Sequence, residues 1–516
     1  MSVRTLTDVK LSLSQSETEL VKIAEKKLGK KPAYFRILRK SIDARDKNGI
    51  KYVYSIEFSA QKPPEKREEL ERLPAHKRPQ KTVLVVGSGP AGLFCALRLL
   101  ERGITPVVVE RGARVDERAR KIALFSAGGA LDLNANVQFG EGGAGTFSDG
   151  KLNTQTHGVF NRAVLETFVK FGAPEEILWL NKPHVGSDNL KNVVRRMREY
   201  IIERGGQVRF DTLLTDIQTE NGELKSVTLA STKDGGTETL EVAAVALAVG
   251  HSARDTFAML DKRGVYMTRK DFAVGVRIEH LQQKIGFAQY GNAFSQLPPA
   301  DYKLVSHASE RSAFTFCMCP GGYVMPATSE EGCVVTNGMS NYARDGKNAN
   351  AALIAQVKAA DFGSEHPLAG VEFQRRLERL AFQAGGSDYA APTQRLEDFL
   401  RGRVSDGFGE VQATYPRARF ADLNAVLPPF VSETLKNAVS DMERRLKGFA
   451  HPDALLTGVE TRTSSPLRIE RDEAYHSLSC KRLFPCGEGA GYAGGITSSA
   501  ADGLRVADKI FAFFNE

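Results

Sequence analysis

Three glycines between an apolar strand and an apolar helix constrain this chain more than any other feature. The predicted strand 82–86 leads into residues 87–92, Gly-Ser-Gly-Pro-Ala-Gly, and an apolar helical stretch follows at 93–100. A second apolar strand, 107–109, ends at Glu110, which lies 23 residues after the first glycine. A strand, a G-x-G-x-x-G turn, a helix, and a strand that ends in an acid are together typical of a dinucleotide-binding unit.

Each residue type in this turn has a physical role in that interpretation. Gly87 permits the tight turn, Gly89 lets a pyrophosphate approach the backbone, and Gly92 lets the helix pack on the strand. The N-terminus of the helix offers free N–H groups and a partial positive charge to the phosphates. The acid can accept hydrogen bonds from a ribose. We therefore predict cofactor contacts at Gly87, Ser88, Gly89, Pro90, Ala91, Gly92, Glu110 and the adjacent Arg111.

The same glycine spacing occurs twice more, at 140–145 and at 489–494. The first of these copies follows a polar segment, and the second is not followed by a strand with an acid, so neither is a complete fingerprint. Glycine-rich backbone still lets a flat ligand approach closely, and residues 146–151 add hydroxyls, a carboxylate and an ammonium group. We predict ligand contacts in this loop at Gly142, Gly143, Gly145, Thr146, Ser148 and Lys151.

Composition restricts the class of protein without choosing a substrate. The 516 residues suffice for two or three domains, and 42% apolar and 26% charged residues fit an ordinary globular chain. A net charge of +8 permits an anionic partner but does not require one. We find neither an apolar run of the ~20 residues that a membrane span needs nor an apolar signal at the N-terminus, and we expect a cytoplasmic protein. The six cysteines are expected to be reduced thiols.

The first 60 residues predict a separate small unit. Alternating apolar residues at 9–13, a helical apolar face at 20–28, a strand at 34–38 and an Asn48-Gly49 turn give the order β-α-β-β. The proline-bearing segment 61–81 is predicted to be a linker. Further along the chain, we expect long helices near residues 189–204, 349–360 and 498–514.

Four segments resemble, in the same order, the flavoprotein superfamily that holds FAD in the manner of glutathione reductase. They are residues 87–92 with Glu110, the strand 208–210, the segment 245–250, and the segment 483–488. Val249 replaces the family's Thr, and Glu488 stands where the family usually has Asp. The resemblance implies bound FAD, and implies further contacts at Val208, Gly250, Gly487, Glu488, Gly495, Ile496 and Thr497.

A closer resemblance covers nearly the whole chain and is to a bacterial group of uncharacterised FAD-dependent dehydrogenases. It is carried by residues 139–152, 40–45, 317–322 and 458–466. It implies an α/β fold in which a Rossmann-like FAD-binding domain is interrupted by an inserted α+β cap domain. We expect an N-terminal domain at 1–60, a linker at 61–81, the FAD-binding domain at 82–270 and 451–516, and the cap at 271–450.

This resemblance implies an FAD-dependent oxidoreductase, and it defines no substrate. FAD carries the redox chemistry, while the protein binds, orients and tunes it. One complete fingerprint fits one dinucleotide, so NADH or NADPH, as a transient electron donor, would have to dock without a Rossmann unit of its own. We expect a small-molecule substrate under the cap.

Catalytic residues are not assigned by the sequence, and we expect no metal site. Cys317 and Cys319 could be a redox pair, but C-x-x-C is the usual redox spacing and small buried cysteines are common, so a structural role is favoured. A lone histidine such as His251 is more often structural. Lys151 is predicted to lie near the N1/O2 or N5 edge of the flavin, against the alternative of a solvated surface charge.

An alternative function is modification of RNA, because flavin-dependent tRNA-modifying enzymes share the nucleotide fold. A basic patch on the N-terminal unit could face phosphates. A solvated charged surface is the simpler interpretation of the same residues and is favoured. The residues are Lys26, Lys27, Lys30, Lys31, Arg36, Arg39 and Lys40.

Overall fold

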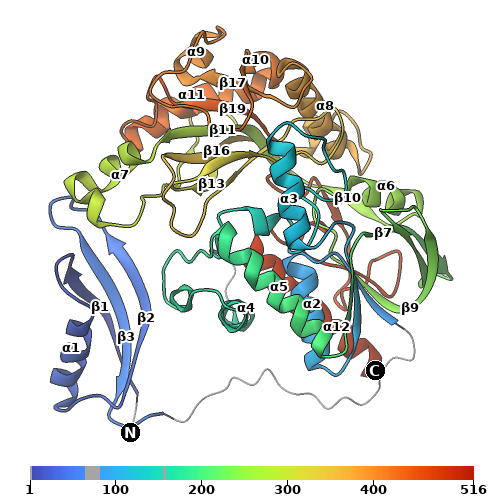
Figure 1. Ribbon diagram of the computed structural model, residues 1–516, viewed down its shortest axis with the longest axis horizontal. Helices are drawn as coiled ribbons and strands as arrows, with labels where there is room; N and C mark the ends of the chain where they lie inside the picture. The colour runs from blue at the N-terminus through green and yellow to red at the C-terminus, as the bar shows by residue number, and fades with distance from the viewer. Residues whose placement is uncertain (1–2, 64–81, 155–157, 516) are drawn as a thin grey trace.

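Two seven-stranded sheets organise the computed structural model, with a small three-stranded sheet beside them (Figure 1). The structure describes residues 3–63, 82–154 and 158–515. The predicted linker at 61–81 therefore lies, apart from its first three residues, outside the described part of the chain. Among the described helices, none is both long and apolar enough to cross a membrane.

The first large sheet has a parallel part and an antiparallel extension. The parallel strands, in the order β6-β5-β4-β9 with β21 beside β9, are β4 (Thr82–Val86), β5 (Pro106–Val109), β6 (Gln207–Arg209), β9 (Thr237–Leu247) and β21 (Leu483–Pro485). The long β9 also pairs antiparallel with β8 (Glu223–Ser231), and β8 pairs with β7 (Thr212–Glu220). Because β4 occupies the middle of the sheet, the turn after it opens where parallel strands end together.

Four helices pack together around this sheet, namely α2 (Pro90–Glu101), α4 (Val159–Lys170), α5 (Ser187–Glu203) and α12 (Ile496–Asn515) (Figure 1). Helix α2 lies deepest, and its residues Ala91 to Leu99 are all buried. Arg98 Nε donates to Asp508 Oδ1 at 2.8 Å and so ties α2 to α12. Helix α3 (Val115–Ser126) rises from this sheet toward the second one, and α6 (Arg254–Lys262) follows β9. The helices expected near 189–204 and 498–514 are confirmed as α5 and α12.

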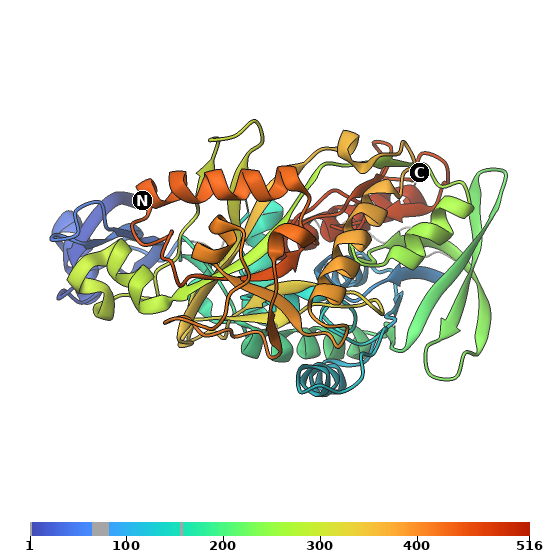
Figure 2. The ribbon, with the colours of Figure 1, turned by 90° about the horizontal axis from the view of Figure 1, so that it is seen from above.

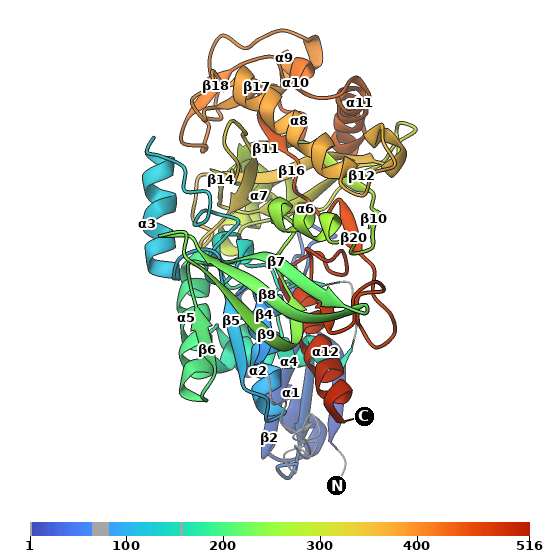
Figure 3. The ribbon, with the colours of Figure 1, turned by 90° about the vertical axis from the view of Figure 1, so that its right-hand side faces the viewer.

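The second large sheet is mostly antiparallel and lies above the first in the side view (Figure 3). Its strand order is β12-β13-β16-β11-β19-β17-β18. The strands are β11 (Phe272–Leu281), β12 (Val305–Ser306), β13 (Ala313–Cys319), β16 (Asn348–Val357), β17 (Ala391–Arg395), β18 (Ala418–Phe420) and β19 (Leu455–Glu460). The helices packed with this sheet are α8 (Ala369–Ala384), α9 (Leu396–Arg401), α10 (Leu423–Val426) and α11 (Pro429–Arg445), and α7 (Gln282–Tyr290) lies at its end next to the N-terminal unit.

One sequence prediction is wrong in this region. The segment 349–360, expected as a helix, is mostly strand β16, which pairs with β11 on one side and β13 on the other. Nine of its ten residues are buried. A strand covered on both faces shows no alternation of apolar and polar residues, so its alanine-rich sequence resembles a helix. Tertiary pairing outweighs the small helix preference of alanine.

Two short ribbons complete the arrangement. The chain leaves the first sheet through β10 (Met267–Arg269) and returns through β20 (Leu467–Ile469), and these two strands pair antiparallel. Strands β14 (Tyr323–Pro326) and β15 (Thr336–Met339) form a separate antiparallel ribbon. The second sheet is therefore built from a segment inserted between β10 and β20.

The N-terminal unit has the predicted β-α-β-β order. It consists of β1 (Arg4–Ser12), α1 (Thr18–Leu28), β2 (Tyr34–Asp43) and β3 (Lys51–Ser59), in an antiparallel sheet of order β1-β3-β2. It lies at one end of the molecule, and the β7–β9 ribbon lies at the other (Figure 2). Its edge strand β2 meets the rest of the protein, because the N–H of Lys40 donates to the carbonyl of Trp179 and the N–H of Asn181 donates to the carbonyl of Lys40.

Candidate cofactor-binding site

The three glycines of the turn between β4 and α2 have different surroundings. Gly87 has φ +102°, and a Cβ added there would lie 2.3 Å from the carbonyl oxygen of Ala248. A Cβ at Gly92 would lie 1.9 Å from the carbonyl oxygen of Gly87. At Gly89, by contrast, the nearest described atom would be Gly143 Cα, at 3.7 Å. Two glycines are thus required by the protein's own packing, whereas the backbone of Gly89 faces open space.

Two further glycine-rich segments converge on this turn from distant parts of the sequence. A Cβ at Gly143 would lie 2.9 Å from Gly89 Cα, and a Cβ at Gly145 would lie 2.9 Å from Ile496 Cγ1 at the start of α12. The N–H of Gly142 donates to the carbonyl of Ser88 at 3.0 Å. The predicted contact segments around 87–92, 142–145 and 495–497 are therefore neighbours in space.

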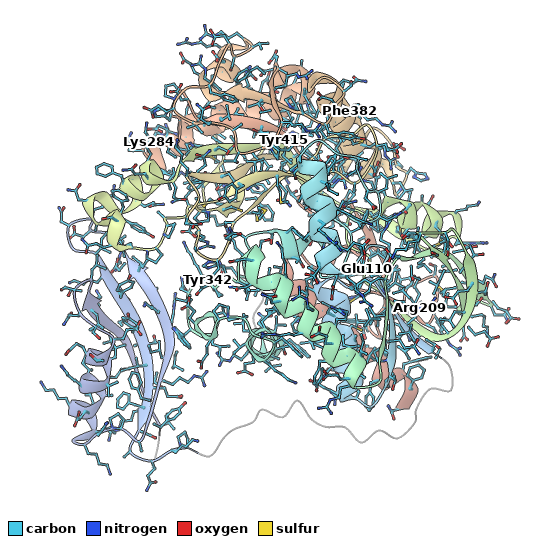
Figure 4. All side chains as sticks on the ribbon, in the orientation of Figure 1. Glu110, Arg209, Lys284, Tyr342, Phe382 and Tyr415 are labelled. Carbon is cyan, nitrogen blue, oxygen red and sulfur yellow. The ribbon has the colours of Figure 1, made fainter. Side chains whose placement is uncertain are left out.

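Glu110 holds two of these segments together. Its Oε2 accepts from the N–H of Ser88 at 2.9 Å and from Ser88 Oγ at 2.8 Å. Its Oε1 accepts from the N–H groups of Gly112 and Gly140, both at 3.0 Å. The side chain is 5% exposed and lies near the lower end of α3 in Figure 4. A ribose hydroxyl at this carboxylate would have to share or replace one of four donors, of which only the Ser88 hydroxyl can rotate away.

Arg118, on α3, supports the loop that carries the second glycine motif. Its guanidinium is fully buried, and burial lowers its pKa to about 10, so that it remains charged at neutral pH. All three of its nitrogens donate to backbone oxygens at 2.8 to 3.2 Å. The acceptors are the carbonyls of Asn136, Val137, Gly140, Glu141 and Gly143. One side chain thus fixes the path of the backbone across residues 136–143.

Two other predicted contacts, Thr146 and Ser148, lie in the same loop, just after the glycines at 142–145. Thr146 is buried, and among the described residues its Oγ1 has no hydrogen-bond partner. Ser148 Oγ donates to the carbonyl of Gly145 at 2.7 Å. Thr497 Oγ1 donates to the carbonyl of Leu152 at 2.8 Å and so joins this loop to α12.

Lys151 is a partly buried member of an ion cluster and not the solvated surface charge of the alternative interpretation. Its ammonium lies 3.0 Å from Asp149 Oδ2 and donates to the carbonyl of Met318 on β13. Arg344 Nε also donates to Asp149, at 2.9 Å, and Ser340 bonds the same carboxylate. The pKa of Asp149 is held well below its usual range by these cations, so the cluster stays ionised.

The residues that the flavoprotein resemblance added lie at two places. Val208 pairs with Val108 at the edge of the parallel strands. At the other place, Gly487 packs against Ala91, with an added Cβ 2.7 Å from Ala91 Cβ, and a Cβ at Gly250 would meet no described atom within 4 Å. Arg111 is turned toward other protein groups, because its guanidinium stacks 4.1 Å from the Phe139 ring and bonds Asp255 at 2.9 Å.

Glu488, one of the contacts that the resemblance implied, lies beside titratable residues that were not predicted as cofactor contacts. His251 Nδ1 lies 3.3 Å from Glu488 Oε1, and its Nε2 has no hydrogen-bond partner among the described residues. Burial lowers the pKa of Lys270, and Arg468 lowers it further. His251, Lys270 and Arg468 come from three separate segments, so no local sequence pattern joins them to Glu488.

The residues present fit an FAD. The first turn of α2 carries no acid, so the backbone N–H groups that face the open side of Gly89 can receive phosphates. Added Cβ atoms at Gly494 and Gly495 would meet no described atom within 4 Å, which leaves backbone exposed at the start of α12. Close approach to bare backbone on two sides suits a flat ring system joined to a pyrophosphate.

Comparison with known proteins agrees with this description. Family models match residues 82–189 as an FAD binding domain, residues 271–463 as an FAD-dependent protein C-terminal domain, and residues 4–59 as a domain of unknown function. A protein of Clostridium beijerinckii, described as uncharacterized, is 43% identical over 539 residues, which cover 100% of this chain and 99% of that protein.

Solved structures also match. One is a glycerol-3-phosphate dehydrogenase of Bacillus halodurans complexed with FAD, with 13% identity, a TM-score of 0.38, and coverage of 84% of this chain and 65% of that one. Another is a geranylgeranyl bacteriochlorophyll reductase-like protein of Thermoplasma acidophilum, with 12% identity, a TM-score of 0.37, and coverage of 85% and 80%.

The fold, the glycine-lined site and the matched FAD-binding domain define an FAD-binding flavoprotein of mixed α/β architecture. The small three-stranded domain precedes its Rossmann-like unit. The chain belongs to the same family of bacterial FAD-dependent proteins as the Clostridium beijerinckii protein.

Proposed function

We propose that the chain is an FAD-dependent oxidoreductase that passes electrons between bound FAD and a small-molecule substrate held under the second sheet. The observation that carries the proposal is the convergence of the turn at Gly89, the loop at 142–145 and the start of α12 around exposed backbone. FAD, when bound, supplies two-electron chemistry. We propose residues 82–270 and 451–516 as the FAD-binding domain and residues 271–450 as the cap, with strand β19 of the later segment pairing into the sheet of the cap.

In this function the protein's own groups bind, orient and exclude water. The α2 N-terminus and the Gly89 backbone receive the phosphates, and Glu110 holds the turn and the 140s loop in register. The cap contacts the FAD-binding part, because Gln138 Nε2 donates to the carbonyl of Ala327 at 3.2 Å and the N–H of Ser187 donates to the carbonyl of Ser340. These contacts, which lie next to the β14–β15 ribbon, support closure of the site by the cap. NADH or NADPH is our proposed electron donor, docking from outside the single Rossmann unit.

The purified protein should be yellow, and denaturation should release a flavin that mass spectrometry identifies as FAD. Rapid mixing of the bound flavin with NADH and with NADPH, followed at the flavin absorption band, should identify the donor. A colourless protein that takes up no added FAD would contradict the proposal. A protein that binds FAD but is reduced by neither nucleotide would remove the proposed donor.

Lys151→Met is expected to lower the midpoint potential of the bound flavin by tens of millivolts while FAD stays bound. We propose that the ammonium lies near the N1/O2 or N5 edge, where reduced flavin carries extra electron density. Loss of ~1.4 kcal/mol of stabilisation corresponds to about 30 mV for a two-electron couple. Lys182→Met, which removes a cation paired with Asp301, is the control. An unchanged potential in Lys151→Met, measured by equilibrium dye titration, would remove Lys151 from the flavin site.

The alternative function, modification of RNA, depends on the basic patch predicted on the N-terminal unit. Part of that patch contacts other residues of the protein. Lys40 Nζ lies 2.6 Å from Glu17 and 4.7 Å from the centre of the Tyr52 ring, and Arg39 bonds Asn181 at 2.7 Å. Two of the seven basic side chains are therefore directed at the protein itself, and the oxidoreductase remains the function that we propose. A salt-sensitive shift of tRNA in gel electrophoresis would restore the alternative.

A further inference from the structure

The end of strand β13 places two cysteines in an irregular piece of backbone. The pairing of β13 with β16 shifts register between Phe316 and Cys319. Within this bulge Cys317 has φ +42°, in the left-handed region that residues with a side chain rarely adopt. Bulges of this kind re-aim side chains and occur often beside active sites. Strained backbone of this kind persists only where its surroundings enforce it.

The bulge gathers the two cysteines together with two cations. Cys319 Sγ lies 3.3 Å from the carbonyl oxygen of Cys317. Arg277 Nη2 donates to that same carbonyl at 3.1 Å and lies 3.8 Å from Cys319 Sγ. Lys151 approaches from the FAD-binding part of the chain and bonds the carbonyl of Met318, between the two cysteines.

These contacts make the two thiols unequal. A hydrogen bond from Cys319 lowers the pKa of Cys317 below that of an ordinary thiol, with further help from Lys151 and Arg277 and against the opposing effects of burial and of Asp149. The same hydrogen bond, together with burial, raises the pKa of Cys319.

The two acids near these cysteines, Asp149 and Glu460, lie beside cations. They therefore oppose the Cys317 thiolate only in part. Asp149 is paired with Lys151 and Arg344. Glu460 lies 3.6 Å from Arg277 Nη1, and burial raises its pKa to about 7. At neutral pH Glu460 is therefore only partly ionised, and the cations are incompletely neutralised by carboxylates.

Access also separates Cys317 from the other thiols of the chain. Cys317 is partly exposed, whereas Cys95, Cys333, Cys480 and Cys486 are buried. Burial raises the pKa of Cys333 and of Cys480 to about 11. A partly exposed thiolate with a buried thiol in contact is the arrangement of a nucleophilic and a resolving cysteine.

We propose that Cys317 and Cys319 form a redox-active dithiol that reduces a low-molecular-weight disulfide bearing carboxylates. The Cys317 thiolate attacks one sulfur of the substrate, a Cys317–substrate disulfide forms, and the first substrate thiolate leaves and takes a proton from solvent. Cys319 then loses its proton and attacks Cys317 Sγ, which releases the second substrate thiol. The substrate gains two electrons and two protons, and the two cysteines lose them. The cations Lys151 and Arg277 favour an anionic substrate.

This site goes beyond the proposed flavin function, because the half-reaction needs no flavin. Its test uses the full-length protein as purified, reduced with excess thiol and then freed of it. The probe is dithiobis(nitrobenzoate), an aromatic disulfide that carries two carboxylates and releases a coloured thiolate. We expect a rapid phase that releases two equivalents of coloured thiolate and leaves a protein lighter by two hydrogens, with peptide mapping that joins Cys317 to Cys319.

Three variants and a pH series define the roles. Cys319→Ser should release one equivalent and retain a mass adduct on Cys317, Cys317→Ser should lose the rapid phase, and Cys333→Ser should behave as the unaltered protein. At pH 6 the rapid phase should run at least severalfold faster than an ordinary cysteine peptide, because the larger thiolate fraction outweighs the weaker nucleophilicity of a low-pKa thiol.

Two outcomes would overturn the dithiol. One is an unaltered protein that stops at the mixed adduct, and the other is a rapid phase that survives in Cys317→Ser. Both are read from thiol release and protein mass, whereas the proposed function is read from flavin absorbance. The two proposals can therefore fail separately.

Discussion

Gly89→Val should give a protein that folds normally and does not retain FAD. An added Cβ at this glycine meets only Gly143 Cα, at an ordinary contact distance of 3.7 Å, and the backbone φ of −71° is one that any residue adopts. The branched side chain would instead occupy the space above the start of α2, where we propose that the pyrophosphate lies. Overpacking of this kind costs about 1–3 kcal/mol, so FAD affinity should fall about 10- to 100-fold.

Two other glycines provide the comparison. Gly407→Val also adds a side chain where no described atom lies within 4 Å, but far from the site in sequence, and it should retain FAD. Gly92→Ala would push a Cβ to 1.9 Å from the carbonyl oxygen of Gly87, so it should lose FAD together with thermal stability. Flavin absorbance after gel filtration and thermal melts of the apoproteins would separate these cases. Normal FAD retention by Gly89→Val would show that the cofactor does not pass over this turn.

The βαβ unit could be predicted from sequence because its constraints are local. The positive φ of Gly87 and the close packing of Gly92 arise within a few residues of each other in the chain, and only glycine meets either requirement. The convergence of residues 142–145 with residues 495–497 was suggested by their glycines and by the family resemblance. The spacing itself does not encode which distant segments will meet, since that depends on how α5 and α12 pack against α2.

Features that depend on tertiary contact were missed for the same reason. Strand β16 is flanked by two strands and covered on both faces, so it lacks the alternation that would have separated it from a helix. The bulge at Cys317 is set by the register of β13 on β16, which a C-x-C pattern in an ideal strand does not contain. From the C-x-C spacing alone a structural role was favoured, and the dithiol that we propose depends on this bulge.

The ion pairs at the predicted site show a further limit. Lys151 could be recognised as a polar member of a glycine-rich loop, but its partners are Asp149 nearby and Met318 in the second sheet. The prediction that it lies at the flavin edge stays a prediction. Its position between the FAD-binding part and the second sheet connects the proposed flavin site with the proposed dithiol through a single side chain.

Arg118→Met should cause the largest loss of stability among the changes considered, and should also abolish FAD binding. The buried guanidinium donates to five backbone carbonyls of residues 136–143, which pass beside Gly89 and Glu110. Methionine fills much of the same volume but donates no hydrogen bond, and each buried carbonyl left without a donor costs about 1–3 kcal/mol. We expect a total loss of about 3 kcal/mol or more, because water can satisfy only part of the set.

Arg120→Met is the matched control, because Arg120 lies on the same helix with its side chain exposed. Arg118→Lys keeps the charge but replaces a planar fork by three donors on one atom, so it should fall between the two. Thermal melting and retained flavin per chain are the measurements. The loop path and the FAD site depend on the same guanidinium, so both readouts should fall together in Arg118→Met. A variant that melts early yet keeps its full FAD content would show that residues 140–145 do not contact the cofactor.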